Sequence, residues 1–303
     1  MKTDKNALVI RPGSLGDQIA TIPVLTSLKK NHFNVYLAGN EKVNTFFEKK
    51  GIIARGIGFG DYCLTEFFSE RKKIKISDFP DFDLVICYIE RNEIFSQNLV
   101  STYGTKVVFH PIPKKITCQI TEFLLMPLKK MGLNIHYPET VKRNACDLLF
   151  IHPGSGSKKK NWPAENFVEV YRYFQRICKP KIILGECEIS DYEFWKKNTD
   201  APDLLIPKNL VELSQALETG KWFIGNDSGV SHLAAFTGLK TFIIFGPTDP
   251  AIWAPEGKNV KIVSLHAGCS PCNIETRNMC ANNICLQEIK IEHIISLVEK
   301  EIR

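Results

Sequence analysis

The stretch Trp222–Pro250, WFIGNDSGVSHLAAFTGLKTFIIFGPTDP, joins two short apolar runs through a polar loop and a short helix. The first run, Lys221–Gly225, leads into small polar residues that favour the start of a helix, which we predict over Val230–Thr237. The second run, Thr241–Phe245, ends at another polar loop, residues 246–250. Free N–H groups and the dipole at a helix start bind phosphate. The stretch therefore predicts an anion site where strands of one sheet end.

The same alternation of β-rich runs with helical stretches extends along the whole chain and predicts an α/β protein with parallel sheets. At 303 residues and 44% apolar residues, the chain is long enough for two domains. Residues 132–144 lack periodicity and contain Pro138, so we predict the boundary there. Expected strands are Ala7–Ile10, Val35–Ala38, Leu84–Ile89, Lys106–Phe109, Leu148–His152 and Lys181–Leu184. Expected helices include Thr117–Met131, Ala164–Ile177 and Gln287–Arg303, and the apolar spacing of residues 19–28 predicts another.

Composition narrows the class of protein. No apolar run approaches the roughly 18 residues of a membrane span, and no cleavable signal precedes the first strand, so a cytoplasmic location is expected. The net charge of +6 suits an anionic substrate or an acidic membrane surface, but also a mildly basic enzyme with no special partner. Because the basic clusters are scattered and not interleaved with aromatic residues, no nucleic-acid partner is expected.

Three glycine-containing loops with ionisable residues follow predicted strands: 11–17, 153–161 and 226–232. In the first, Gly13 and Gly16 allow a close approach of the backbone to a ligand, and Asp17 stands at a helix start. Asp17 either caps this helix or accepts a proton from a substrate hydroxyl.

The loop Pro153–Lys160, PGSGSKKK, gathers small residues and lysine charges where a pyrophosphate could bind. It is not a P-loop, because Asn161-Trp162 follows the lysines where the Walker pattern needs Ser or Thr. The chain also lacks G-x-G-x-x-G after its first strand, which disfavours a nicotinamide dinucleotide site. The alternative is that the lysines are only a solvated surface run. This alternative applies least to Lys160, which lies next to Trp162-Pro163.

Metal sites are weakly indicated. Asp81 and Asp83 precede a strand without other converging oxygens, so we expect no metal there. His232 could bind a phosphate or order its turn. Cysteines cluster in the pattern Cys269-x₂-Cys272-x₇-Cys280-x₄-Cys285, for which structural zinc, an iron–sulfur cluster and a metal-free thiol loop all remain open.

Several motifs together resemble glycosyltransferase family 9, the bacterial lipopolysaccharide heptosyltransferases. The resemblance runs from about Ala7 to the C-terminus. The motifs, in family order, are Ser14-Leu15-Gly16-Asp17 with Thr21-Ile22-Pro23, His152-Pro153-Gly154 with Lys160-Asn161-Trp162-Pro163, Asp227-Ser228-Gly229 with His232-Leu233-Ala234-Ala235, and Gly246-Pro247-Thr248-Asp249-Pro250. The late cysteine cluster agrees with it.

The resemblance implies a GT-B type fold, with two Rossmann-like domains whose parallel sheets face each other across a cleft. Residues 1–140 would bind the acceptor on the Ser14 and Gly16 loop, residues 141–286 would bind the nucleotide-sugar, and the helix 287–303 would cross back to the N-terminal domain. Asp17 would be the general base, and Lys160 would neutralise the departing nucleoside diphosphate. The donor-binding residues would be Ser155, Glu188, Asp227, Ser228, Gly229 and His232, with Glu186 competing with Glu188 for the ribose.

By the same analogy the enzyme would invert the anomeric carbon, moving a heptose from a nucleotide donor such as ADP-heptose to a lipid-linked saccharide core at the inner membrane. It would need no cofactor and no divalent ion. Cys87 and Ala20 depart from the family pattern on the acceptor side, where relatives often have aspartate and histidine. The alternatives are a nucleotide-sugar-binding or cysteine-cluster protein without transferase activity, and a nicotinamide oxidoreductase.

Overall fold

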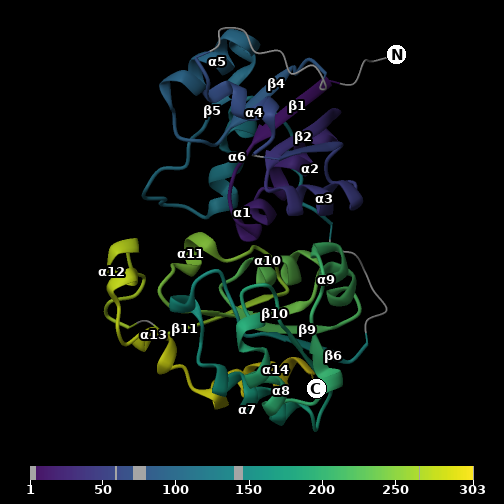
Figure 1. The fold of residues 1–303 in the computed structure, drawn as a ribbon, viewed down its shortest axis with the longest axis vertical. Coiled ribbons are helices and arrows are strands. Elements are labelled where there is room, and N and C mark those ends of the chain that lie inside the picture. Colours follow the sequence, from purple (N-terminus) through teal and green to yellow (C-terminus); the bar gives the residue numbers. More distant parts are fainter. Residues whose placement is uncertain (1–4, 59, 71–79, 140–145, 266, 303) are drawn as a thin grey trace. The chain divides into compact units, whose positions relative to one another are not determined.

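The computed structural model describes residues 5–58, 60–70, 80–139, 146–265 and 267–302. The chain divides into two compact units, residues 1–139 and 140–303, each built around one parallel sheet. In Figure 1 the colours of the first unit run from purple to teal, and those of the second run through green to yellow. Among the described residues, no helix is long and apolar enough to span a bilayer.

The first unit has a five-stranded sheet in the order β3-β2-β1-β4-β5, and every neighbouring pair is parallel. Its strands are β1 (Lys5–Ile10), β2 (Phe33–Gly39), β3 (Arg55–Gly58), β4 (Leu84–Cys87) and β5 (Val107–Phe109). Its helices are α1 (Leu15–Ala20), α2 (Ile22–Lys30), α3 (Glu41–Lys49), α4 (Tyr62–Thr65), α5 (Glu93–Tyr103) and α6 (Ile120–Lys130), with 3₁₀ turns η1 (Glu66–Phe68) and η2 (Gly104–Lys106).

Strand β1 lies between β2 and β4, so the strand order reverses at β1. In open α/β sheets, ligands bind beyond the carboxyl ends of the strands at such a switch point. The loop after β1, which leads to Asp17, therefore occupies the position where this unit is expected to bind a ligand. Cys87, at the end of β4, is instead fully buried in an apolar cluster with Phe67 and Phe95, and burial raises the pKa of its thiol to about 11.

The single helix predicted over residues 19–28 is two helices in the structure. α1 ends at Ala20, and Thr21 is both its C-cap and the N-cap of α2. The hydroxyl of Thr21 donates to the carbonyl of Asp17. Pro23 stands in the first turn of α2, where its missing N–H costs nothing, whereas inside a continuous helix it would leave a carbonyl unpaired. The apolar spacing was correct, but the proline divides the helix.

The second unit has a six-stranded parallel sheet in the order β11-β10-β9-β6-β7-β8. Its strands are β6 (Leu148–His152), β7 (Lys179–Ile183), β8 (Leu204–Leu205), β9 (Trp222–Asn226), β10 (Lys240–Phe245) and β11 (Val260–Ser264). Its helices are α7 (Ala164–Phe174), α8 (Tyr192–Asn198), α9 (Leu210–Leu217), α10 (Gly229–Phe236), α11 (Pro250–Trp253), α12 (Ile274–Met279), α13 (Ile284–Gln287) and α14 (Ile291–Ile302), with 3₁₀ turns η3 (Lys158–Lys160), η4 (Ile189–Asp191) and η5 (Ala201–Asp203).

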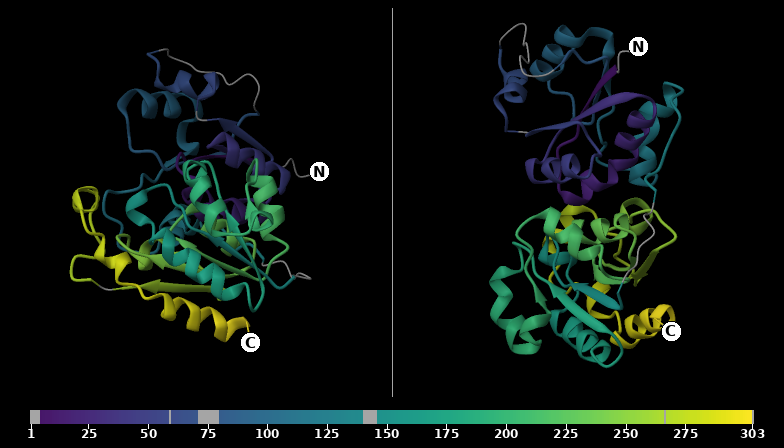
Figure 2. Two further views of the ribbon diagram at one scale, coloured as in Figure 1. Left: turned by 60° about the horizontal axis from the view of Figure 1, so that its bottom comes forward. Right: turned by 90° about the vertical axis from the view of Figure 1, so that its right-hand side faces the viewer.

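The final helix packs against the core of the second unit, as Figure 2 shows in yellow. Ile294 and Val298 of α14 are fully buried in the same apolar cluster as Phe174 of α7. At the end of the helix, the indole N–H of Trp222 donates to the carbonyl of Glu301. A crossing of this helix to the N-terminal domain stays a prediction.

Asn226, the last residue of β9, joins two neighbouring strands of the second sheet at their carboxyl ends. Its side chain is fully buried, donates to the carbonyl of Pro153 at 2.6 Å and accepts the N–H of Trp162 at 2.9 Å. Both partners belong to the loop after β6, which is the neighbour of β9 in the sheet. Asn226 therefore fixes that loop beside the start of α10.

We expect Asn226→Ala to lower the free energy of unfolding by about 2–6 kcal/mol, because it leaves two buried backbone groups without partners at about 1–3 kcal/mol each. Urea denaturation measures this change. Glu169→Ala on the exposed face of α7 is the control and should change stability by about 0.5 kcal/mol or less. Equal stability of the two variants would contradict the bonding role of Asn226.

Candidate active site

Three loops of the second unit meet because their strands are neighbours. β10, β9 and β6 stand side by side in the sheet, and β6 is where the strand order reverses. The loops that follow these strands carry the sequence motifs around Lys160, Asp227 and Thr248. All the strands are parallel, so the three loops leave the same edge of the sheet.

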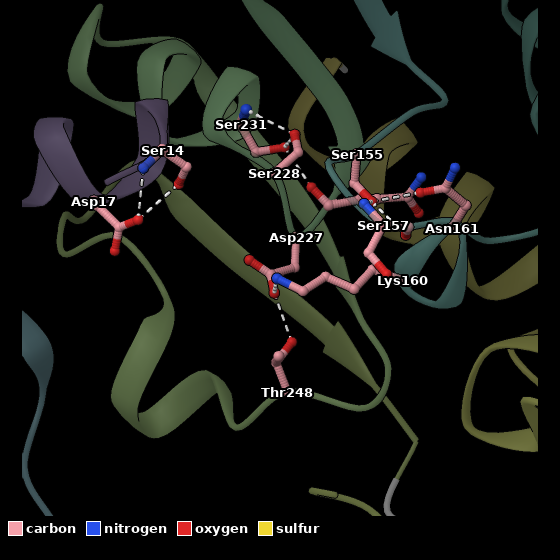
Figure 3. A network of polar contacts seen from close by, with 11 residues as sticks. Ser14, Asp17, Ser155, Ser157, Lys160, Asn161, Asp227, Ser228, Ser231 and Thr248 are labelled. Atoms are coloured by element: carbon pink, nitrogen blue, oxygen red, sulfur yellow. Dashed lines mark hydrogen bonds and ion pairs between the residues drawn. The ribbon is translucent and has the colours of Figure 1, made fainter. Parts of the chain in front are cut away.

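The carboxylate of Asp227 is the centre of this cluster. The ammonium group of Lys160 lies 2.7 Å from Oδ2 of Asp227, and the hydroxyl of Thr248 donates to the same oxygen at 2.5 Å (Figure 3). The Asp227 side chain is 7% exposed, whereas that of Lys160 is 23% exposed. The lysine can therefore be reached by a ligand while the carboxylate stays largely covered.

Next to Asp227, the start of α10 has the capping geometry that the sequence predicts. Ser228 is the N-cap residue, and its hydroxyl accepts the N–H of Ser231 at 3.3 Å. Gly229 is the first residue of the helix, and His232 is buried one turn further, with its N–H bonded to the carbonyl of Ser228. Unpaired N–H groups of such a first turn and the helix dipole favour an anion.

Ser155 shapes the lysine loop. Its hydroxyl lies 2.6 Å from Oδ1 of Asn161 and 2.8 Å from the carbonyl of Ser157, and it also accepts the N–H of Ser157. These contacts close the loop into a compact turn that ends in η3. The predicted ligand residue Ser155 thus holds the backbone that presents Lys160.

Glu188 is buried after β7, whereas its competitor Glu186 is exposed. The carboxylate of Glu188 accepts the N–H of Gly185 at 2.9 Å and lies 3.5 Å from Nε2 of His152. A Cβ atom on Gly154 would be only 1.7 Å from Oε1 of Glu188, so only glycine lets the carboxylate lie there. Burial alone would raise the pKa of Glu188, but the hydrogen bond and charge of His152 and the backbone N–H groups outweigh it and hold that pKa below its ordinary value.

In the first unit, both carboxylate oxygens of Asp17 accept hydrogen bonds. The guanidinium of Arg11 donates to Oδ1 at 3.0 Å. Oδ2 accepts the N–H of Ser14 at 2.9 Å and its hydroxyl at 2.8 Å (Figure 3). Ser14 is the N-cap residue of α1 and Asp17 is at N3, so the bond from the Ser14 N–H to Asp17 is one half of a capping box and Asp17 does stabilise the start of this helix. Gly13, with φ of +146°, is required for this loop, because a Cβ there would lie 2.7 Å from that of Asp17.

Arg11 is 7% exposed, and burial lowers the pKa of its guanidinium while the charge of Asp17 opposes that change. Its carbonyl accepts a hydrogen bond from the buried amide of Gln18, which fixes the loop to α1. The pair Arg11–Asp17 therefore presents a held carboxylate, 29% exposed, where β1 ends. Gly16 is the second residue of α1.

Two of the metal candidates, Asp81 and Asp83, form hydrogen bonds in the part of the chain that the structure describes. The carboxylate of Asp83 accepts the N–H of Asn6 at 2.9 Å, and the carbonyl of Asp81 accepts the side-chain amide of Asn6. Both contacts stabilise the start of β1. Cys269, Cys272, Cys280 and Cys285 are free thiols. Among the described residues, no group of three or more histidine, cysteine, aspartate or glutamate side chains is arranged to hold a metal ion.

Comparisons with known proteins agree with this architecture. A sequence profile of glycosyltransferase family 9 (heptosyltransferase) matches residues 133–281. The chain is 30% identical over 329 residues to a lipooligosaccharide heptosyltransferase 2 of Campylobacter jejuni, covering 94% of each chain. The chain belongs to glycosyltransferase family 9. It is therefore a glycosyltransferase, as the sequence motifs predicted.

Solved structures of family 9 members share the fold. A family 9 glycosyltransferase from Veillonella parvula has a TM-score of 0.74 at 20% identity, covering 100% of this chain and 98% of that one. The Escherichia coli heptosyltransferase WaaC, solved with ADP, has a TM-score of 0.69 at 16% identity, covering 97% of this chain and 99% of that one. The GT-B type fold class predicted for this family 9 enzyme is confirmed.

Sequence reasoning assigned no role to three residues of these loops and strand ends: Arg11, Thr248 and His152. Arg11 lies in a loop, and Thr248 and His152 lie in motifs, that were recognised. The contacts of Arg11 and Thr248 with aspartates depend on how the loops fold. His152 ends β6, and only the pairing of β6 with β7 brings it near Glu188. A buried charge needs a partner, and this requirement could have directed a search for them.

We expect Glu188→Gln to be less stable than the wild type at pH 7 and this difference to shrink in acid. Because the pKa of Glu188 in the fold lies below its ordinary value of 4.5, the ionised carboxylate stabilises the fold above that pH, and the effect is lost as pH falls through the lowered pKa. Melting temperatures between pH 7 and pH 3 measure it. The exposed Glu186→Gln is the matched control, and a difference that grows in acid would contradict the sign.

Proposed function

We propose that the chain is an inverting heptosyltransferase that moves a heptose from ADP-heptose to the inner core of a lipopolysaccharide or lipooligosaccharide acceptor. The named activity of the Campylobacter relative and the ADP in the WaaC structure support this assignment. The acceptor is lipid-linked, so the enzyme would work at the cytoplasmic face of the inner membrane. The observation that carries the proposal is the Lys160–Asp227–Thr248 cluster at the start of α10.

On the donor side, negative charge develops on the diphosphate as its bond to the sugar breaks. The ammonium of Lys160 and the N–H groups around Ser228 and Gly229 supply positive charge and donors at the sheet edge. Preorganised donors of this kind stabilise a leaving group without a divalent ion. Glu188 would accept hydrogen bonds from ribose hydroxyls, and His232 would order the turn.

On the acceptor side, Asp17 would be the general base. The acceptor oxygen forms a bond to the anomeric carbon on the face opposite the diphosphate, the bond from that carbon to the diphosphate oxygen breaks, and the hydroxyl proton passes to the Asp17 carboxylate. One displacement inverts the configuration. The bonds from Arg11 and Ser14 would hold the carboxylate in one orientation for this transfer.

Replacing Asp17 should separate chemistry from binding. We expect Asp17→Asn to lower kcat by about 10²–10⁴-fold, because the amide cannot accept the proton, while the affinity for ADP stays unchanged. Product formation and nucleotide titration measure the two effects. Asp81→Asn, which removes an exposed carboxylate of the same unit, should keep full activity. An Asp17→Asn enzyme as fast as the wild type would remove the general-base role.

The nucleotide is tested by thermal shift. At a concentration 100 times its dissociation constant, ADP should raise the melting temperature by roughly 5–10 °C, because binding to the folded state alone adds about 2.7 kcal/mol. UDP and GDP at the same concentration are the controls and should give smaller shifts. A larger shift with UDP or GDP than with ADP would contradict ADP-heptose as the donor and indicate a sugar carried on that other nucleotide.

A further inference from the structure

The cysteine segment, Cys269–Cys285, lies outside the proposed chemistry but touches two of the three loops that form the donor site. It follows β11 and contains α12 and the start of α13. Its contacts are backbone and side-chain hydrogen bonds to the lysine turn Lys158–Lys160 and to the Gly246–Pro250 loop. These are the loops that bring Lys160 and Thr248 to Asp227.

The tie to the lysine turn is reciprocal. The ammonium of Lys159 donates to the carbonyl of Cys280, and the side-chain amide of Asn283 donates to the carbonyl of Lys159 at 3.0 Å. Each partner thus contributes one side chain and one backbone carbonyl. Because Lys159 immediately precedes Lys160, the two bonds restrain the backbone from which Lys160 extends.

A second set of contacts reaches the loop after β10. The N–H of Cys272 donates to the carbonyl of Pro247 at 2.8 Å. The hydroxyl of Ser270 donates to the carbonyl of Gly246 at 2.6 Å. Leu286, just beyond the segment, packs so closely on Gly246 that a Cβ there would lie 2.4 Å from its Cγ. The backbone before Thr248 is therefore held from the same segment.

The backbone conformation of Asn283 allows its side chain to reach Lys159. Its φ of +45° lies in the left-handed region, which asparagine adopts more readily than most residues. In that conformation its N–H donates to Sγ of Cys280 at 3.3 Å, and its side chain is directed to Lys159. The buried Cys285 and Leu286 follow and anchor this end of the segment in the core.

We propose that the cysteine segment is a brace that sets the distance between the lysine turn and the Gly246–Pro250 loop, with Asn283 as the positioning residue for Lys160. Lys160 and Thr248 meet on a single oxygen of Asp227, so small shifts of either loop break one of the two contacts. The brace rests on the proposed role of Lys160 at the diphosphate. It predicts that nucleotide affinity depends on residues with no contact to the nucleotide.

The first test compares two adjacent asparagines. Asn283→Gly keeps the left-handed backbone accessible and removes the side-chain bond, so ADP should bind about 3–10-fold more weakly and the KM of the donor should rise similarly. Asn282→Gly, which changes an exposed neighbour, should bind ADP like the wild type. Isothermal titration with ADP measures the affinities, and the melting temperature reports stability separately.

The second test uses two adjacent lysines and does not depend on folding of the Asn283 variant. Lys158→Met and Lys159→Met each remove one positive charge from the same turn, but only Lys159 bonds to Cys280. The Lys159 variant should therefore weaken ADP binding more than the Lys158 variant. Equal losses would show that charge alone acts and would overturn the brace.

A double-mutant cycle separates the brace from the proposed function. Lys160→Met should weaken ADP binding about 10-fold or more, and adding Asn283→Gly to it should cause no further loss, since the brace acts through Lys160. Unchanged ADP affinity in Lys160→Met would overturn the proposed function itself. The brace alone would be overturned if Lys160→Met weakens ADP binding but Asn283→Gly binds ADP like the wild type. This holds even if Asn283→Gly has a lower melting temperature.

Discussion

The carboxylate of Asp227 is the group on which the second unit's loops converge. A carboxylate that is 7% exposed is unstable unless it is paired and hydrogen-bonded, and Lys160 and Thr248 supply the partners. Lys160 lies 67 residues before Asp227 and Thr248 lies 21 residues after it. The loops after β6 and β10 are thus held against the loop after β9. An anionic ligand that attracts Lys160 competes with Asp227, and Thr248 and the α10 dipole remain to stabilise the aspartate.

Each unit places an aspartate paired with a cationic side chain at the carboxyl ends of its strands. The two pairs differ in how far apart their partners lie in the sequence. Arg11 and Asp17 are 6 residues apart within one loop and helix start, so the pair forms as soon as that turn folds. The Lys160–Asp227 pair requires β6 and β9 to be neighbours and Asn226 to fix the loop between them. The first pair is therefore set by local structure, whereas the second is set by the pairing of strands in the sheet.

This difference in sequence separation explains which features could be predicted from the sequence. The strands β9 and β10 and the helix α10 lie within one residue of their predicted positions, because apolar runs and capping residues are local signals. The helix predicted from Gln287 begins instead at Ile291, after the separate α13. Local patterns also identified the loops of Asp17 and Lys160. They could not reveal that Thr248 bonds to Asp227 or that His152 meets Glu188, since sheet pairing creates both contacts.

One thiol of the cysteine segment, that of Cys285, is buried in the apolar core. Burial raises the pKa of Cys285 to about 11, so its thiol is protonated at neutral pH and packs in the core beside Leu286. Cys269, at the other end, is exposed. The segment is thus fixed firmly where α13 joins the core, close to Asn283 and its bond to Lys159. That anchoring lets a surface segment restrain the lysine turn, because the restraint is transmitted to the sheet through Leu286 and Gly246.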